Sequence, residues 1–355
     1  MSQLTNPLVS VVIPAYNAES FIKEAIDSVL NQTYQNVEVI VIDDGSSDST
    51  LEILKQYENS SKVKILTHPD NDNLGVSKTR QLGVENSKGE YIAFLDADDI
   101  FLPNKLEIQV DAIQQNEEAI LCHTGMKVKS ELGDSPRISS IEKHFSMPST
   151  PYLYSLSEQE YFLKQNRICN STTLIKAKLL KEFSFASCQL FQYEDWLLWI
   201  MLSAKGKFLF LPQQLIQYRY HGNSATHAII SQPLRSLYSK IELCLSAFTR
   251  LDDDNLKKLF IPELQECLME LTMKYLASSG NESKYDSVDE LMQSLFQSNS
   301  DGDNLDYSYH SRLLKEAQSR INKLEAQNQA IQNSKVWRFR NKMISIKNFF
   351  SKTKI

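Results

Sequence analysis

The sequence contains few cysteines and glycines and no long apolar run, and each shortage excludes a class of protein. Its five cysteines are scattered through 355 residues without paired spacing. This argues against a disulfide framework and against a zinc site, and it is typical of a protein in the reducing cytoplasm. No window contains the roughly 18 consecutive apolar residues of a membrane-spanning helix. Residues 1–7 are polar, so we expect no secretory signal there.

Two glycine-rich phosphate-binding motifs are also missing after the first predicted strand. A dehydrogenase would have Gly-x-Gly-x-x-Gly at that position, and a nucleotidyltransferase would have a glycine-rich loop that carries Lys or Arg. The chain has Pro14-Ala15-Tyr16-Asn17 there instead. The sequence therefore disfavours both classes. A nucleotidyltransferase, which would share the α/β fold class predicted below, is nevertheless kept as an alternative function.

Acidic side chains are absent from residues 335–355, although the whole chain carries a net charge of −6. This tail contains seven bases: Lys335, Arg338, Arg340, Lys342, Lys347, Lys352 and Lys354. The rest of the chain is therefore strongly acidic, which is not typical of a nucleic-acid-binding protein. Because aromatic side chains are interspersed with the bases, we predict that the tail contacts an anionic membrane surface. Packing of the tail on the protein itself or on a partner is the alternative.

The first 130 residues alternate short apolar strand patterns with amphipathic helix patterns. We predict strands over residues 8–14, 37–42, 62–66 and 91–95. We predict helices over residues 19–31, 51–57 and 76–86, and another that begins at Pro103. Strands separated by single helices form βαβ units, so the fold class is α/β with a doubly wound, mostly parallel sheet. In such sheets, ligands bind beyond the carboxyl ends of the strands.

The pattern is looser over residues 122–155 and becomes regular again further on. We predict strands over residues 168–175, 207–211 and 217–221, and helices over residues 176–183 and 193–200. From Gln232 onward the pattern is helical. We therefore expect a catalytic domain over residues 1–230, a helical extension over 231–277, a linker over 278–308 and a terminal helix with the basic tail over 309–355. Apolar residues spaced by three and four between Leu314 and Ile331 favour a short coiled coil and a homodimer through residues 309–334, with a packed surface helix as the alternative.

The strand pattern over residues 91–95 ends in three carboxylates, Asp96, Asp98 and Asp99. Side chains two residues apart on an extended chain project to the same side, so Asp96 and Asp98 can face one ligand. Their oxygen donors suit Mg²⁺ or Mn²⁺, which prefer a few carboxylates together with substrate phosphates. A loop of solvated acids before the next helix is the alternative reading.

Taken together, six segments in order resemble glycosyltransferase family 2, the inverting enzymes of the GT-A-type fold. They are residues 11–17, 41–48, 73–77 with Arg80, 89–99 with Pro103, Glu194-Asp195-Trp196 and Tyr218-Arg219-Tyr220-His221. The resemblance covers about residues 8–224. It implies a metal-dependent transfer of a sugar from a nucleotide diphosphate sugar, a UDP-sugar by preference, to the hydroxyl group of a glycan or lipid-linked acceptor. It also implies a role in cell-surface glycan or polysaccharide synthesis in the cytoplasm or at the inner face of the membrane. A catalytically inactive sugar-nucleotide-binding scaffold is the alternative from another class.

On the nucleotide side, the resemblance implies that Pro14 and Tyr16 flank the base and that Asp44 accepts a hydrogen bond from it. Capping of the following turn is the other role open to Asp44. Arg80 would face the nucleotide or hold the strand-end acids, unless it is an ordinary surface arginine. The family usually has Ala-Arg-Asn here, whereas this chain has Thr79-Arg80-Gln81.

On the reacting side, the resemblance implies that Asp98 binds the metal and that Asp96 lies near the ribose or the metal. Arg219 and His221 would lie near the diphosphate, although a single histidine is often structural. Asp195 matches the general base that deprotonates the acceptor hydroxyl. We expect its place at a helix N-terminus to favour the ionised form. A helix N-cap is the competing role, and Glu194 is the alternative base.

Overall fold

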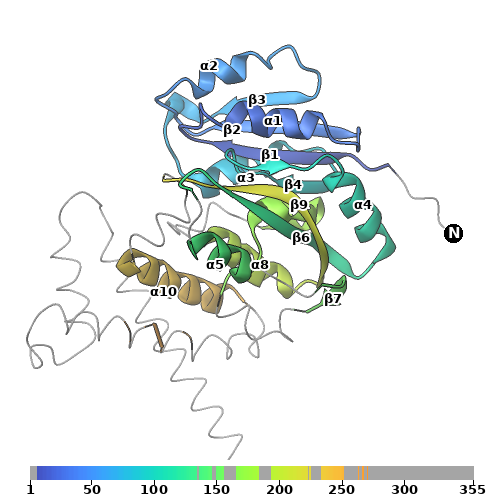
Figure 1. Cartoon of the computed structure of the whole chain (residues 1–355), viewed down its shortest axis with the longest axis vertical. Helices are drawn as coiled ribbons and strands as arrows, with labels where there is room; N and C mark the ends of the chain where they lie inside the picture. Colours follow the sequence, from blue (N-terminus) through green and yellow to red (C-terminus); the bar gives the residue numbers. More distant parts are fainter. Residues whose placement is uncertain are drawn as a thin grey trace, which may run out of the picture. The chain divides into compact units, whose positions relative to one another are not determined.

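The computed structural model describes residues 6–133, 136–145, 149–155, 165–183, 193–222, 224, 233–251 and four isolated positions, 263, 266, 267 and 270 (Figure 1). The chain divides into two compact units, residues 1–253 and 254–355. The fold described below is that of the first unit. The predicted linker, coiled coil and basic tail lie outside the described residues, and the predicted domain boundaries stay predictions.

The first half of the sheet is parallel and follows the predicted alternation of strands and helices. Its strands have the order β3-β2-β1-β4, and every neighbouring pair is parallel. In chain order the elements are β1 (Val9–Ala15), α1 (Ile22–Leu30), β2 (Val37–Asp43), α2 (Thr50–Lys55), β3 (Val63–Thr67), a 3-10 turn (Pro69–Asn71), α3 (Val76–Asn86) and β4 (Tyr91–Phe94). All four strands therefore end at one edge, where the predicted polar clusters lie.

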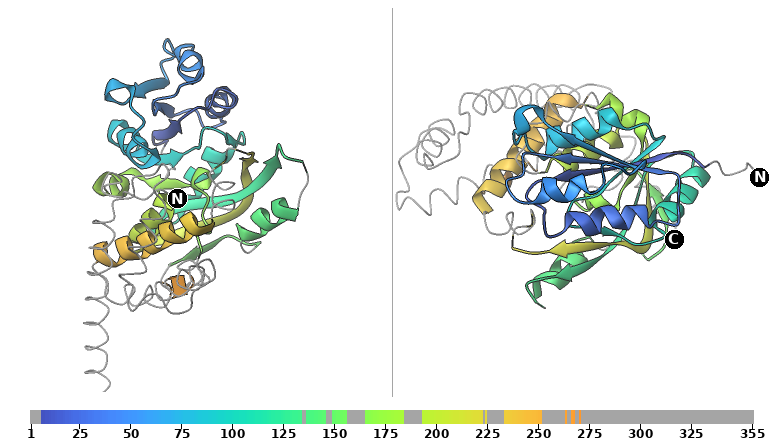
Figure 2. Two further views of the ribbon diagram at one scale, coloured as in Figure 1. Left: turned by 90° about the vertical axis from the view of Figure 1, so that its left-hand side faces the viewer. Right: turned by 90° about the horizontal axis from the view of Figure 1, so that it is seen from above.

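Helices lie on both faces of this sheet (Figures 1 and 2). The alternation of strand side chains explains why. In β1, Val11 and Ile13 belong to one apolar core, together with Ile26 of α1. Val12, between them in sequence, belongs to a second core, together with Val84 of α3. Because both faces of each central strand are covered, its side chains are apolar without interruption.

The second half of the sheet mixes parallel and antiparallel pairs. It continues as β4-β8-β6-β9-β5, with β7 paired to β9. β8 runs antiparallel to both β4 and β6, whereas β6 and β9 are parallel. The elements are β5 (Ile100–Phe101), α4 (Lys105–Gln115), β6 (Ala119–Ser130), α5 (Pro136–His144), β7 (Tyr152–Tyr154), β8 (Leu174–Lys176) and β9 (Lys207–Tyr220).

In this half one strand was not predicted, and two predictions were wrong in their boundaries. The segment of loose pattern contains the long strand β6. The two strands predicted near residues 207–221 are one strand, β9, whose register with β6 shifts next to Gly125. The strand predicted over residues 168–175 is instead a 3-10 turn, Asn170–Thr172, followed by β8. The hydroxyl groups of Thr172 and Thr173 donate to carbonyls three residues back, and such local bonds compete with strand pairing.

The described residues contain three further helices, α7 (Ala177–Glu182), α8 (Glu194–Ser203) and α10 (Pro233–Arg250). α8 is apolar around most of its circumference, because it is buried between the sheet and α10. Its first two residues, Glu194 and Asp195, are acidic; Glu194 is buried and Asp195 is only partly exposed. Among the described helices, none is both long enough and apolar enough to cross a bilayer.

Candidate active site

Hydrogen bonds between their loops hold the ends of β1 and β2 together. The Asn17 side chain accepts from the backbone N–H of Ser47 at 2.9 Å, and the Ser46 hydroxyl accepts from the N–H of Asn17 at 3.0 Å. Asn17 adopts a left-handed conformation, with φ at 48°, which asparagine tolerates better than most residues. Beside this joint Pro14 is half-buried and Tyr16 is 52% exposed. The two residues predicted to flank a base therefore lie at the correct edge of the sheet, with an aromatic ring available for stacking.

Asp44 fixes the loop that leads into α3. Its two carboxylate oxygens accept from the backbone N–H groups of Leu74, at 2.7 Å, and Gly75, at 3.0 Å. Asp44 thus holds the start of α3 and not the turn that follows it in sequence. Gly45 makes the close approach possible, because its φ is +72° and a Cβ atom there would lie 2.6 Å from the carbonyl oxygen of Asn71. Contact between Asp44 and a base stays a prediction.

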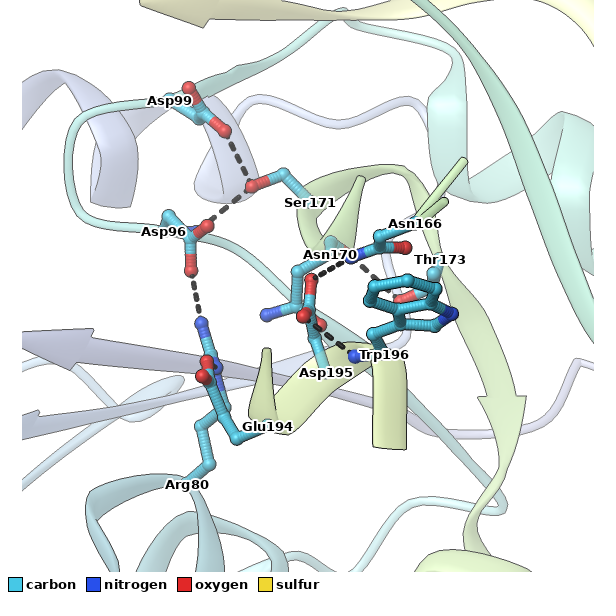
Figure 3. Close-up of polar contacts among 10 residues, drawn as sticks. All are labelled: Arg80, Asp96, Asp99, Asn166, Asn170, Ser171, Thr173, Glu194, Asp195 and Trp196. Atoms are coloured by element: carbon cyan, nitrogen blue, oxygen red, sulfur yellow. Dashed lines mark hydrogen bonds and ion pairs between the residues drawn. The ribbon is translucent and has the colours of Figure 1, made fainter. Parts of the chain in front are cut away.

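Arg80 is buried and links two acidic groups that are far apart in sequence. Its Nη2 lies 2.8 Å from Asp96 Oδ1, and its Nη1 donates to Glu194 Oε1 (Figure 3). Burial alone lowers the pKa of Arg80, but the charges of Asp96 and Glu194 raise it overall. The side chain is only 6% exposed, so the reading as a surface arginine is wrong. Arg80 thus holds one of the strand-end acids, Asp96, whereas its contact with a nucleotide stays a prediction.

The three aspartates after β4 have different surroundings. The side chains of Asp96 and Asp98 are 30% and 28% exposed. Asp99 is only 1% exposed, and its carboxylate accepts from the Ser171 hydroxyl at 2.6 Å and from the backbone N–H of Arg219 at 3.0 Å. Burial and the nearby charges of Asp98 and Asp96 raise the pKa of Asp99 well above its usual range. A loop of solvated acids is therefore the wrong description of this cluster.

Arg219 and His221 lie close to Asp98 but in different ways. His221 Nε2 is 3.0 Å from Asp98 Oδ2, and the His221 ring packs against Phe21 at 4.8 Å between centroids. The Arg219 guanidinium donates to the carbonyl of Asp98 at 2.9 Å and to Glu24 Oε2 at 2.7 Å. Its side chain is 5% exposed. In this structure Arg219 therefore joins β9 to α1 and to the loop of residues 96–99, called the acidic loop below. Contact of either residue with a diphosphate stays a prediction.

The residues present fit a divalent cation that is bound together with a substrate. In the described part of the chain, no group of three or more His, Cys, Asp and Glu side chains could enclose a metal ion. Asp98 and Asp96 nevertheless present partly exposed carboxylates at a strand end. Mg²⁺ and Mn²⁺ are commonly held by one or two carboxylates plus substrate phosphates, which is the donor set available here.

Asp195 lies in the first turn of α8 and is only partly exposed. Its Oδ2 accepts from the side chain of Asn166 at 3.0 Å and its Oδ1 accepts from the N–H of Trp196 at 2.7 Å (Figure 3). Burial and the neighbouring charge of Glu194 raise its pKa to about 7. We expected the helix N-terminus to favour the ionised form and so to lower the pKa of Asp195. The net shift is upward, so this expectation was wrong. The N-cap is Tyr193, so the competing role of Asp195 as N-cap is also wrong.

Sequence reasoning missed Asn166, which contacts Asp195, Ser171, which contacts Asp96, and Asn170, which contacts Arg80. Asn170 and Ser171 lie inside the strand predicted over residues 168–175, and Asn166 lies just before it. A signal was present in the run Asn170-Ser171-Thr172-Thr173, because four small polar residues in an apolar pattern are unusual for a buried strand. With its amide oxygen turned to the guanidinium, Asn170 accepts from Arg80 Nη2 at 2.9 Å and Nε at 3.1 Å.

The structure is thus an α/β sheet whose carboxyl edge carries two partly exposed aspartates, Asp96 and Asp98. Comparison with known proteins identifies the class of protein. Residues 10–183 match the model of the family described as Glycosyl transferase family 2. An uncharacterised glycosyltransferase of Haemophilus influenzae is 35% identical over 224 residues, which are 62% of this chain and 68% of that protein. Another, from Methanocaldococcus jannaschii, is 32% identical over 244 residues, which are 67% of this chain and 80% of that protein.

Among solved structures, S. aureus TarS 1-349 in complex with UDP-GlcNAc matches with a TM-score of 0.59 and 19% identity, covering 81% of this chain and 79% of that one. At this identity the similarity establishes the fold, which is that of GT-A glycosyltransferases. The chain belongs to glycosyl transferase family 2, and it is a glycosyltransferase.

Proposed function

We propose that the protein transfers a sugar from a UDP-sugar to an acceptor hydroxyl with inversion at the anomeric carbon, and that a divalent cation assists the transfer. The observation that carries the proposal is the link Asp96–Arg80–Glu194, which ties the acidic loop to the start of α8. The predicted base, Asp195, is next to Glu194 in the same turn. Support for the donor comes from TarS, a structural neighbour that was solved in complex with UDP-GlcNAc.

On the donor side, Pro14 and Tyr16 would hold the base, and Asp44 would accept its N–H group. An ionised acceptor strengthens such a bond. Asp98 and Asp96 would hold Mn²⁺ or Mg²⁺. The cation would stabilise the departing nucleoside diphosphate. His221 lies beside Asp98, where it would contact the diphosphate and orient the carboxylate.

On the acceptor side, Asp195 would remove the proton from the attacking hydroxyl group. A base is most effective when its pKa lies near the working pH, and the pKa of Asp195 is raised to about 7. Glu194 is a weaker candidate, because its carboxylate is committed to Arg80. Asn166 donates to Asp195 and so orients the carboxylate toward the acceptor.

The acceptor we propose is a glycan or lipid-linked hydroxyl used in cell-surface polysaccharide synthesis, reached from the cytoplasmic face of the membrane. The basic composition of residues 335–355 supports this location. Co-sedimentation with anionic vesicles tests it: the full chain should be recovered at low salt and a chain ending at Ser334 should not. Equal recovery of the two chains would contradict the membrane role.

A donor screen tests the proposed function directly. The purified chain is incubated with a panel of nucleotide diphosphate sugars, with Mn²⁺ or with EDTA, and release of the nucleoside diphosphate is measured. We expect release from a UDP-sugar, dependent on the cation and absent in Asp98→Ala. Release that is equal in EDTA would contradict the metal role, and binding without any release would favour the inactive scaffold.

A further inference from the structure

The 3-10 turn Asn170–Thr172 is buried although its side chains are polar. The exposed fractions of Asn170, Ser171 and Thr172 are 4%, 0% and 2%. Buried polar groups are almost always hydrogen-bonded, so the partners of such a turn indicate what holds it and what it holds in place. Here the partners divide into a rigid support on one side and the candidate active site on the other.

Helix α4 provides the support. Gln109 Nε2 donates to the carbonyl of Thr172 at 2.9 Å and to that of Cys122, in β6, at 3.0 Å. Lys105 Nζ donates to the carbonyl of Thr173 at 3.4 Å and to Gln109 Oε1 at 2.6 Å. All of these groups are buried, so the backbone of the turn is fixed to the core of the unit.

Ser171 uses its hydroxyl group for two contacts with the acidic loop. The oxygen accepts from the backbone N–H of Asp96 at 3.1 Å, and the hydroxyl donates to Asp99 Oδ2 at 2.6 Å (Figure 3). The loop also closes on itself, because the N–H of Asp99 donates to the carbonyl of Asp96 at 3.0 Å. One hydroxyl group therefore holds both ends of the turn that carries Asp98.

The neighbouring residue, Asn170, contacts the other half of the site. With its amide oxygen turned to the guanidinium, Asn170 accepts from Arg80, which in turn pairs with Asp96 and Glu194. The turn thus touches both the acidic loop and the arginine that joins this loop to the start of α8.

We infer that Ser171 is a positioning residue for the diphosphate side of the site, and that it acts by fixing the acidic loop in the conformation that binds the donor. The inference rests on the proposed function. Ser171 is completely buried and acts through Asp96 and Asp99, so its loss should weaken donor binding without removing any group that touches the donor.

The test compares Ser171→Ala with Thr172→Val. Thr172 is the matched control, because its hydroxyl is equally buried but donates to the carbonyl of Cys169, within the same segment, at 2.6 Å. Ser171→Ala loses two buried hydrogen bonds and Thr172→Val loses one, so the melting temperature should fall in both variants, by about 2–4 °C for each bond lost. Ser171→Cys keeps a weaker donor of similar size, and its results should lie between those of wild type and Ser171→Ala.

Hydrogen exchange of the unliganded protein gives the first readout, and it does not depend on activity. The peptide that contains Asp96 should exchange about tenfold faster in Ser171→Ala than in wild type or Thr172→Val, because the Asp96 amide loses its acceptor. UDP affinity in Mn²⁺ gives the second readout and should fall about tenfold in Ser171→Ala alone.

The inference would be overturned if Ser171→Ala and Thr172→Val showed the same hydrogen exchange in the Asp96 peptide and the same UDP affinity. A wild-type protein that binds no UDP would overturn the proposed function instead, and with it the role for donor binding. The two failures are distinguishable, because the second appears in the wild type before any variant is compared.

Discussion

Glu194 and Asp195 are adjacent in sequence at the start of α8, yet their carboxylates have different partners. Glu194 Oε1 accepts from Arg80, whereas Asp195 Oδ2 accepts from Asn166 at 3.0 Å (Figure 3). The contact with Arg80 occupies the Glu194 carboxylate. The donors to Asp195 within the described residues are the neutral Asn166 amide and the N–H of Trp196, and we therefore propose Asp195 as the carboxylate that exchanges a proton with an acceptor.

We therefore expect Asp195→Asn to keep UDP affinity but to lower the transfer rate by about two to four orders of magnitude, the usual contribution of a general base. Transfer and UDP binding are measured on the same preparation. Glu194→Gln serves as the comparison, and it should lower stability because it breaks a buried pair with Arg80. Near-normal transfer by Asp195→Asn together with an inactive but folded Glu194→Gln would reassign the base to Glu194.

The pH dependence of transfer follows from the raised pKa of Asp195, about 7. A base acts only when it is ionised, so the rate should fall about tenfold per pH unit below pH 7 and level off above it. The residual rate of Asp195→Asn should not show this step. A flat wild-type profile between pH 5 and 8 would contradict the role of Asp195, provided that the protein stays folded over that range.

Substitutions at Gly45 and Gly133 test the close approach between the end of β2 and the loop that precedes α3. Both have positive φ, +72° and +81°, but only at Gly45 would a Cβ atom meet the backbone, at 2.6 Å from Asn71 O. Gly133→Ala should cost only the backbone strain, about 1–2 kcal/mol in the free energy of unfolding. Gly45→Ala should cost clearly more and also weaken UDP binding, because the residue 71–75 loop must shift away from Asp44. Equal losses measured by urea denaturation would show that the close approach is unimportant.

Much of the parallel half could be predicted from sequence, because its signals are local. Unbroken apolar runs such as Val39 to Ile42 mark strands covered on both faces, and the acids that follow them mark one edge of the sheet. The mixed half depends on pairings between distant segments. β8 pairs with β4 and β6, and nothing in its three residues encodes these partners.

The candidate site could likewise be predicted from sequence only in part. Asp96, Asp98 and Asp195 belong to recognisable motifs, and the structure brings Asp96 and Glu194 to the same arginine. Ser171 could not be predicted, because its importance lies in a contact with Asp99, 72 residues away along the chain. The raised pKa of Asp195 was also missed, since burial and the charge of Glu194 outweigh the helix terminus.

Lys105 carries a prediction for stability. It is completely buried, its Nζ lies 4.0 Å from the centroid of the Phe101 ring, and burial lowers its pKa from the usual 10.5 to about 7. Between these two values the unfolded chain binds more protons than the folded one. The free energy of unfolding should therefore rise with pH from about 7 to about 10, by up to about 1.4 kcal/mol per unit from this group.

Lys105→Met keeps an apolar side chain against Phe101 and should remove that part of the slope. Lys178→Met, at an exposed position of α7, is the control and should leave the slope unchanged. Stability is measured by urea denaturation at several values of pH. If the free energy of unfolding of wild type and of Lys105→Met changes with pH in the same way, the buried amine keeps its ordinary pKa.

UDP affinity measured by calorimetry tests most directly whether the acidic loop binds a cation together with the donor. Wild type and Asp98→Ala are each titrated with UDP in Mn²⁺ and in EDTA. We expect the wild type to bind tightly only in Mn²⁺ and Asp98→Ala to bind weakly in both. Without ligand, Asp98→Ala should be at least as stable as wild type, because one of the mutually repelling acids is gone. UDP affinity of Asp98→Ala in Mn²⁺ equal to that of the wild type would contradict the account.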